Sequence, residues 1–407
     1  MRDDQHRRSR RLILFDAGLC SQRGHHFNTD LGIVTEAQAR GFQTIVFGLK
    51  NCNDPEVVEK LHPVPLFRLD VYHSEKISED EALNALASNE KYYEALRRIS
   101  FRNIAPDDVL FFHTVHSPNL LGMVRWLEEL AEVSRPKVII EFLYADYLQE
   151  FGSSGYKTKI FSEALRRLAE ISKLRIDVLA ESFYMKERLD SLAEHRLPIN
   201  IAPFPAGYKE LLSEKNGPDR NQSCACRVGI FGRGKDRKGT FLVPEIVTSI
   251  SRVMEGVNFS VQVDLNKADS QRLAEFRTVL EHNRKVDYFE GPISIAHYVE
   301  KLRSCDIILL PYSPAYSVQG SGLCAEAMAI GKVLVAPAYF SQRREIEHFK
   351  AGCVYFDHWN ATAITSALLH AVSNLEVLTT QARLGASRFK EERGPKRFDK
   401  LFDVNSD

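Results

Sequence analysis

The segment from Leu309 to Pro337 constrains the fold of this chain most, because it reads as strand, loop, helix and strand. Residues 305–310 form a short apolar run rich in Ile and Leu, which predicts a buried strand. A helix is expected over residues 322–330, and a second buried strand over residues 333–336. Two buried strands joined by a helix are typical of an α/β protein with a parallel sheet.

The start of this helix has the features of a phosphate-binding site. Gly320, Ser321 and Gly322 bring almost no side chain, so free backbone N–H groups and the positive end of the helix dipole face the same way. Ser321 can cap the helix and Gly331 can end it. Glu326 lies about one turn further on, where its carboxylate can accept hydrogen bonds from two neighbouring hydroxyls, such as those of a ribose.

The same pattern opens the chain and restarts in its second half. A strand is expected at Arg11–Phe15, a helix at about 29–40 and another strand at 44–47, which is the opening of a doubly wound sheet. The pattern restarts with a strand at Cys226–Phe231. The 407 residues are enough for two medium domains. We therefore expect five parts: a basic tail (1–10), an N-terminal domain (11–205), a polar linker (206–225), a C-terminal domain (226–385), and a final helix and tail that can cross back to the N-terminal domain (386–407).

Charge and cysteine content exclude some classes of protein. The chain has 54 Lys and Arg against 54 Asp and Glu, which argues against a dedicated nucleic-acid binder. The seven Cys are scattered without metal-ligand spacing, so we expect reduced thiols in a cytoplasmic protein. No apolar run reaches the roughly 18 residues of a membrane span. The basic stretch Arg2–Arg11 can touch an anionic membrane surface, although a solvated tail is the simpler interpretation.

A second phosphate-binding signal comes after the strand at 226–231. The turn from Gly232 to Gly239 contains Arg233 and Lys238 but lacks the spacing of a Walker loop. The two cations could offset the negative charge that develops when a sugar–diphosphate bond breaks. Alone, the turn could equally be a solvated basic loop.

Together the two segments resemble the donor site of glycosyltransferases with the GT-B fold, most closely the retaining family-4 type. The stretch from Glu326 to Val335 (EAMAIGKVLV) matches the family's second glutamate and the residues after it, and residues 232–239 match Gly-Arg-x4-Lys-Gly. The resemblance implies that Glu326 binds the ribose, that Arg233 and Lys238 bind the diphosphate, and that further donor contacts come from Gly232, Gly291 and the amides of Ser321, Gly322 and Leu323. The family's first glutamate is missing. Its place falls at Val318 or Gln319, so Gln319 is expected at the donor sugar without a negative charge.

The resemblance also implies an acceptor side in the N-terminal domain. Gly24 and His25 fit the glycine-containing loop that faces the acceptor after the first strand. His113 comes after the strand at 108–112, where a family histidine faces the donor sugar, but a core histidine is an equal alternative. Glu141 lies in a buried strand and needs a partner or a function, and Asp146 lies just past that strand. A structural salt bridge is the commoner explanation for both acids.

The expectation is therefore a GT-B fold of two Rossmann-like doubly wound domains with a cleft between them. The resemblance implies transfer of a sugar from a nucleoside-diphosphate sugar to a glycan or glycolipid hydroxyl, with retention of configuration. No cofactor and no metal is expected, since the nucleotide sugar is the donor substrate and no Asp-x-Asp motif is present. A nucleotide-sugar 2-epimerase on the same fold, and a non-catalytic protein that binds a sugar or a partner, stay open as alternatives.

Overall fold

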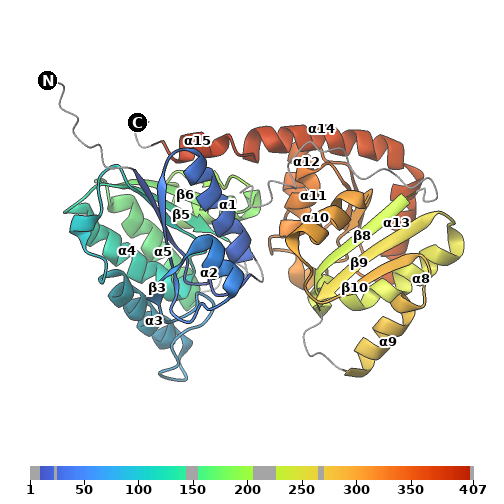
Figure 1. Cartoon of the computed structure of the whole chain (residues 1–407), viewed down its shortest axis with the longest axis horizontal. Helices are drawn as coiled ribbons and strands as arrows, with labels where there is room; N and C mark the ends of the chain where they lie inside the picture. The colour runs from blue at the N-terminus through green and yellow to red at the C-terminus, as the bar shows by residue number, and fades with distance from the viewer. Residues whose placement is uncertain (1–9, 23–24, 144–154, 205–225, 265–269, 404–407) are drawn as a thin grey trace. The chain divides into compact units, whose positions relative to one another are not determined.

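The structure is a computed structural model that describes residues 10–22, 25–143, 155–204, 226–264 and 270–403. The chain divides into two compact units, one of Met1–Gly207 with Arg393–Asp407 and one of Tyr208–Glu392. Each unit is a parallel sheet between helices, which confirms the expected pair of doubly wound domains (Figure 1).

The first unit is built on a seven-stranded parallel sheet with the order β3-β2-β1-β4-β5-β6-β7. Its strands are β1 (Arg11–Phe15), β2 (Gln43–Leu49), β3 (Val64–Phe67), β4 (Val109–Phe112), β5 (Lys137–Phe142), β6 (Arg175–Ala180) and β7 (Ile199–Ile201). Strand β3 was not predicted, because Pro63 and Pro65 indicated only an extended connection. The strand tolerates Pro65 because it lies at the edge of the sheet, where an amide is not needed on both sides.

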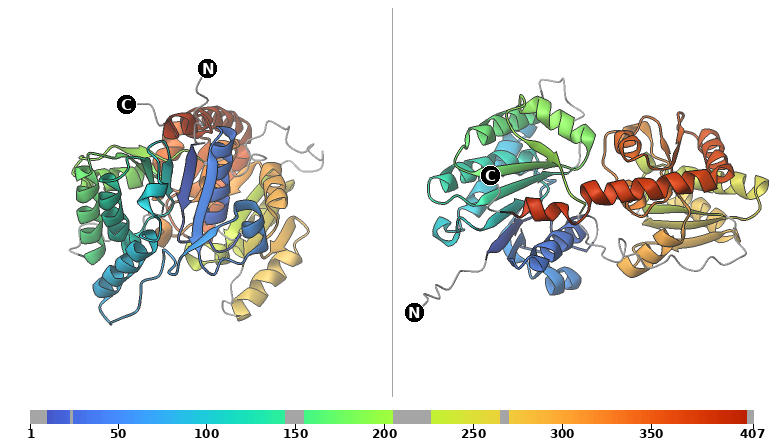
Figure 2. Two further views of the ribbon diagram at one scale, coloured as in Figure 1. Left: turned by 60° about the vertical axis from the view of Figure 1, so that its left-hand side comes forward. Right: turned by 90° about the horizontal axis from the view of Figure 1, so that it is seen from above.

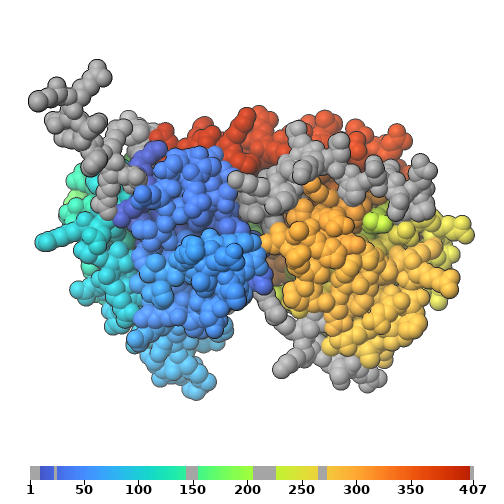
Figure 3. Space-filling view, in the orientation of Figure 1, coloured from blue at the N-terminus to red at the C-terminus, as the bar shows by residue number. Residues whose placement is uncertain are grey.

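The helices of the first unit cover its sheet, with α3, α4 and α5 packed side by side (Figure 1). Helices α1 and α2 also contact each other and form much of the face seen in Figure 3. Their bounds are α1 (His25–Ala39), α2 (Pro55–Leu61), α3 (Glu81–Leu96), α4 (Ser117–Ala131), α5 (Tyr156–Glu170) and α6 (Phe183–Leu192). Helix α1 begins four residues earlier than expected, so His25 and His26 belong to its first turn and not to a polar loop.

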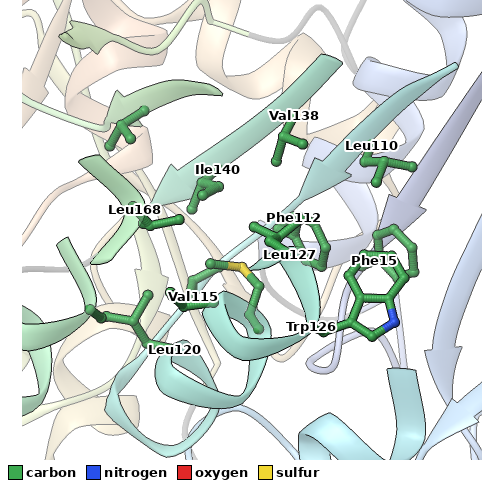
Figure 4. Packing of buried hydrophobic residues seen from close by; sticks show 14 of the residues in the cluster. Phe15, Leu110, Phe112, Val115, Leu120, Trp126, Leu127, Val138, Ile140 and Leu168 are labelled. Atoms are coloured by element: carbon green, nitrogen blue, oxygen red, sulfur yellow. The ribbon is translucent and has the colours of Figure 1, made fainter. Parts of the chain in front are cut away.

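Aromatic packing under β1 and β4 holds the ends of these strands in place. Phe15 stacks on Phe112 with ring centroids 4.6 Å apart, and Trp126 of α4 meets Phe15 edge-on at 6.0 Å. All three side chains are buried, and Figure 4 shows them in one cluster with Leu110 and Val138. Because Phe15 and Phe112 are the last residues of their strands, this packing fixes where the chain leaves the sheet.

The second unit is built on a six-stranded parallel sheet with the order β10-β9-β8-β11-β12-β13. Its strands are β8 (Cys226–Arg233), β9 (Val257–Asp264), β10 (Val286–Glu290), β11 (Ile307–Leu309), β12 (Val333–Pro337) and β13 (Cys353–Phe356). Its helices are α8 (Val243–Val253), α9 (Ser270–Glu281), α10 (Ile295–Ser304), α11 (Gly322–Ala329), α12 (Arg343–Phe349), α13 (Ala361–Ser373) and α14 (Leu375–Arg393). Figure 2 shows the units from two further sides.

The expected strand, helix and strand at the centre of the second unit are present. Helix α11 starts after Ser321, whose hydroxyl accepts a hydrogen bond from the amide of Cys324. Gly331 lies just past the helix in the left-handed region with φ of 69°, which glycine adopts without strain.

The C-terminal residues pack on the first unit. Arg40 of α1 forms an ion pair with Asp399 of α15 (Arg397–Leu401) at 2.7 Å. The Lys137 ammonium donates to the backbone carbonyls of Lys400 and Asp403. The chain thus ends on the sheet with which it began.

Membrane-spanning helices were sought among the described residues. No single helix there is both long and apolar enough to span a bilayer, and only α13 combined with the segment Leu375–Leu401 meets the length and hydropathy criteria, with a bend of 87° between them.

Candidate functional site

In each sheet the strand order reverses direction at one point, and ligands of open α/β sheets bind beyond the strand ends at such points. In the first unit the reversal lies between β1 and β4, and in the second unit it lies between β8 and β11. Most of the residues predicted to be functional lie at one of these two places, so each is described in its own unit.

In the second unit, Arg233 and Lys238 lie beside the reversal. Arg233 ends β8, and Lys238 ends a single 3-10 turn, Asp236–Lys238. The Lys238 ammonium lies over the rings of Tyr316 at 5.5 Å and Tyr312 at 5.9 Å. Burial lowers the pKa of Lys238 to about 8, and the nearby cations, Arg233 among them, contribute to this shift. An anion at this place would therefore meet a marked excess of positive charge.

Gly239 holds this turn against the loop after β11. A Cβ on Gly239 would lie 1.8 Å from the carbonyl oxygen of Pro311, and its φ is 70°. The amide of Ser313 donates to the carbonyl of Arg237 at 2.9 Å. The last glycine of the predicted signature is thus required by a close backbone approach.

Glu326 of α11 is buried close to Lys238. Burial raises its pKa to about 7, while a hydrogen bond from Tyr298 and the charge of Lys238 act to lower it. The Tyr298 hydroxyl donates to Oε2 of Glu326. Tyr298 lies in α10, and nothing in the sequence pattern indicated it.

The helix N-terminus presents two amides. The Ser321 amide donates to Oε1 of Gln342 at 3.0 Å, so it is already engaged. The amides of Gly322 and Leu323 open the helix, where no intrahelical acceptor exists. No atom lies within 4 Å of a Cβ built on Gly322, which leaves room for a phosphate against the backbone.

Gln262 connects the two glycines that the resemblance indicated. Its Oε1 accepts from the Gly232 amide at 3.1 Å, and its Nε2 donates to the Gly291 carbonyl at 2.6 Å. Sequence reasoning missed Gln262, because a glutamine inside a strand carries no motif.

Gln319 lies apart from this pattern of accessible groups. Only 4% of its surface is exposed, and its amide donates to the carbonyl of Tyr316. No carboxylate stands at the position of the family's first glutamate.

In the first unit, a cluster of histidines and carboxylates surrounds the reversal. Asp16 comes directly after β1 and His113 directly after β4, and the last residues of these strands, Phe15 and Phe112, are paired. Nδ1 of His113 lies 2.6 Å from Oδ1 of Asp30 and 3.2 Å from Oδ2 of Asp16. Burial lowers the pKa of His113, but the charges of Asp30 and Asp16 raise it well above the ordinary value. His113 is therefore an imidazolium, and its Nε2 makes no hydrogen bond to any described residue.

The other acceptor-side predictions have mixed outcomes. Nε2 of His25 lies 3.4 Å from the hydroxyl of Thr114, and Thr114 has a left-handed backbone with φ of 56°. Glu141 is buried in β5, and burial raises its pKa to about 7. The charge of His113 acts on Glu141, so it belongs to the same cluster. Gly24 and Asp146 lie outside the described residues.

Two further features of the first unit were not predicted. Within the described part of the chain, Asp16, His26 and His113 form the group that could supply three ligand atoms to a metal ion, since these atoms lie within 4.8 Å of one another. The same atoms make the hydrogen bonds of the cluster, so an ion would have to replace those bonds. A pocket of about 140 Å³ lies next to the cluster, lined by Ala17, Val71, His73 and Tyr92 among others, with Arg68, Lys91 and Arg98 among its charged residues.

Comparison with known proteins gives likeness in structure only. No family model and no curated protein sequence matches the chain. A glycosyltransferase from Rickettsia africae aligns with a TM-score of 0.64 at 11% identity, over 98% of this chain and 100% of its own. HepE from Anabaena, in a crystal structure with UDP, aligns with a TM-score of 0.61 at 14% identity, over 96% and 98% of the two chains. A Listeria monocytogenes protein with the provisional name UDP-N-acetylglucosamine 2-epimerase aligns with a TM-score of 0.61 at 12% identity, over 98% and 99%.

Proposed function

We propose that this protein, which has the GT-B fold, is a glycosyltransferase that moves a sugar from a nucleoside-diphosphate sugar to an acceptor hydroxyl. The observation that carries the proposal is the grouping of Arg233, Lys238 and Glu326 around the N-terminus of α11. Cations and free amides suit a diphosphate, and a buried carboxylate suits ribose hydroxyls. The crystal structures of HepE with UDP and with UDP-glucose support this choice of ligand.

The cations also supply the chemistry of the transfer. When the bond between the anomeric carbon and the diphosphate breaks, negative charge grows on the leaving oxygen. Arg233 and Lys238 would stabilise that charge in the transition state, so we propose that no metal is needed. Retention of configuration, which the sequence resemblance implied, is not part of this proposal, because the first unit contains another candidate to take the acceptor proton.

The remaining features of the proposal come from the sequence resemblance. The transferred group would be a hexose-like sugar, and the acceptor a glycan or glycolipid, as in polysaccharide biosynthesis. The protein would act in the cytoplasm, with the basic N-terminal tail able to touch the inner face of a membrane.

A thermal-shift screen against UDP, GDP, ADP, CDP and dTDP tests the proposal first. A ligand at 100 times its dissociation constant adds about 2.7 kcal/mol, which raises the melting temperature by several degrees. We expect one nucleotide to stabilise the wild type and not Glu326→Ala. Glu300→Ala, an exposed position on α10, is the matched control and should behave as wild type. If no nucleotide stabilises the wild type, the proposal is wrong.

A nucleotide-sugar 2-epimerase is the second candidate, because acids and histidines gather in the first unit beside the Listeria likeness. Epimerisation at C2 exchanges the C2 proton with solvent. UDP-N-acetylglucosamine incubated in D₂O would therefore gain deuterium at C2. A glycosyltransferase would instead release UDP without that label. A protein that binds UDP and does neither would be a non-catalytic binder.

A further inference from the structure

A chain of hydrogen bonds runs from buried Asp16 through His26 to the hydroxyl of Tyr72. Nδ1 of His26 lies 2.7 Å from Oδ2 and 2.9 Å from Oδ1 of Asp16. Nε2 of His26 lies 2.8 Å from the Tyr72 hydroxyl. A carboxylate, an imidazole and a hydroxyl in this order are the parts of a general-base arrangement.

The charge state of Asp16 decides which nitrogen of His26 carries the proton. Burial raises the pKa of Asp16, but the charges and hydrogen bonds of His26 and His113 lower it well below the ordinary value. Asp16 is thus an ionised acceptor, so the proton of a neutral His26 sits on Nδ1. Its Nε2 lone pair is then free to accept, and the Tyr72 hydroxyl donates to it.

The ring of His26 is held in this orientation from several sides. A methyl group on Gly18 would lie 2.1 Å from Cε1 of His26, so the ring packs directly on the Gly18 backbone. The Gly18 amide also donates to Oδ1 of Asp16 at 2.7 Å. The titratable groups that face or neighbour His26 are Asp16, His25, Asp30, Tyr72, His113 and His116.

The group at the end of the chain of hydrogen bonds lies at the surface. Tyr72 is 46% exposed, whereas His26 is 6% exposed. The neighbours of Tyr72, Val71 and His73, line the pocket of the first unit together with Ala17, the residue after Asp16. The hydroxyl that meets Nε2 therefore stands at the border of a cavity that another molecule can enter.

The donor segment points the same way. A retaining transfer uses the leaving phosphate to take the acceptor proton, and the sequence pattern for that route includes a first glutamate. Here the position holds Val318 and a buried Gln319. The chain thus lacks a part of the retaining pattern and has a base that the retaining route does not need.

We propose that His26, oriented by Asp16, is the general base of the transfer and takes the proton of an acceptor hydroxyl that replaces the Tyr72 hydroxyl at Nε2. This inference rests on the proposed glycosyltransferase function. As the acceptor oxygen bonds to the anomeric carbon, its O–H proton passes to Nε2. The bond from the anomeric carbon to the diphosphate breaks, and the diphosphate leaves with the electron pair. His26 becomes an imidazolium beside the Asp16 carboxylate and then loses its proton to water.

A base at His26 has a stereochemical consequence. Because it is separate from the leaving group, it permits direct displacement from the opposite face of the sugar. The product then has the inverted anomeric configuration.

Hydrolysis of UDP-glucose tests this without knowledge of the natural acceptor, because water can take the place of the acceptor hydroxyl. The glucosyl group of UDP-glucose is α-linked, so inversion releases β-glucose, which ¹H NMR detects before mutarotation. We expect β-glucose from the wild type. We expect His26→Ala and His26→Gln to lose about 100-fold or more in kcat with little change in KM, and added imidazole to restore part of the His26→Ala rate.

Two further variants separate a base from a structural histidine. Gly18→Ala should displace the His26 ring and lower kcat while UDP still raises the melting temperature. Tyr72→Phe should raise the hydrolysis rate, since its hydroxyl no longer competes for Nε2. His358→Ala, an exposed histidine of the second unit, controls for the loss of an imidazole.

The possible failures are distinct. If the wild type neither binds UDP nor releases it from UDP-glucose, the proposed function fails and the base fails with it. If the wild type releases α-glucose, or if His26→Gln keeps the wild-type kcat and pH profile, transfer stands and the base is wrong. Loss of activity without imidazole rescue and with a lost UDP thermal shift would assign His26 a structural role.

Discussion

The Tyr298 hydroxyl donates a hydrogen bond to the buried carboxylate of Glu326 across two helices of the second unit, α10 and α11. Burial makes the ionised form of Glu326 costly, and this bond stabilises it. The residue assigned to the ribose therefore depends on a tyrosine 28 positions earlier in the chain.

Removal of this hydroxyl should weaken nucleotide binding through Glu326. In Tyr298→Phe the carboxylate loses a donor, so its pKa rises above the present value of about 7. At neutral pH a smaller fraction of Glu326 is ionised, and we expect UDP affinity to fall several-fold. Calorimetric titration checks this, and raising the pH by about two units should recover most of the loss. Glu326→Gln should show no such recovery.

Nucleotide affinity should depend on pH on both sides of neutrality. Glu326 must be ionised to accept from ribose hydroxyls, and its pKa is about 7. Lys238 must be charged to bind the diphosphate, and burial lowers its pKa to about 8. We expect UDP affinity to be greatest between these values, to fall as acid protonates Glu326 and to fall as base deprotonates Lys238. Lys238→Arg should lose only the alkaline decline, because arginine stays charged. An affinity that does not change over this range would contradict both assignments.

Much of the fold could be predicted from the sequence because local patterns decide it. Ser321 before a helix, Gly331 after it and buried apolar runs on either side predicted the central unit of the second sheet, and the structure has these features. The early start of α1 was missed, because two histidines do not signal a first helical turn. Strand β3 was missed, because Pro65 is tolerated only at an edge that the sequence does not reveal.

The site was less predictable for a related reason. Arg233, Lys238 and Glu326 belong to spaced motifs, so the sequence identified them. Tyr298, Gln262 and Asp16 act through partners that only the sheet order brings together. One signal was present in the sequence, since Asp30 lies one helical turn after His26 on α1.

Gly322 separates a requirement of the fold from a requirement of the ligand. Open space surrounds the position of its Cβ, so Gly322→Ala should change the free energy of unfolding by less than about 1 kcal/mol. A diphosphate that lies against this backbone would meet the new methyl group, and UDP affinity should fall about 10-fold or more. Thermal melts with and without UDP measure both effects. Gly291→Ala is a poor control because its φ of 87° introduces strain.

Glu141 should make the protein less stable as pH rises. Burial raises its pKa to about 7 in the folded state, whereas in the unfolded chain it titrates near 4.3. Below the unfolded value both states hold the proton and there is no cost. As pH rises towards 7 the unfolded chain releases the proton first, so stability falls, and above 7 the full cost is present.

Glu141→Gln removes this cost, so we expect it to raise the free energy of unfolding at about pH 8 by up to about 3 kcal/mol. Below about pH 4.5 it should leave stability close to that of the wild type. Chemical denaturation at several pH values measures the difference. Glu79→Gln, at an exposed position, should show no such pH dependence. If Glu141→Gln is less stable than the wild type at every pH, the ionised carboxylate has a favourable partner in the His113 cluster, and Glu141 then stabilises the imidazolium rather than opposing folding.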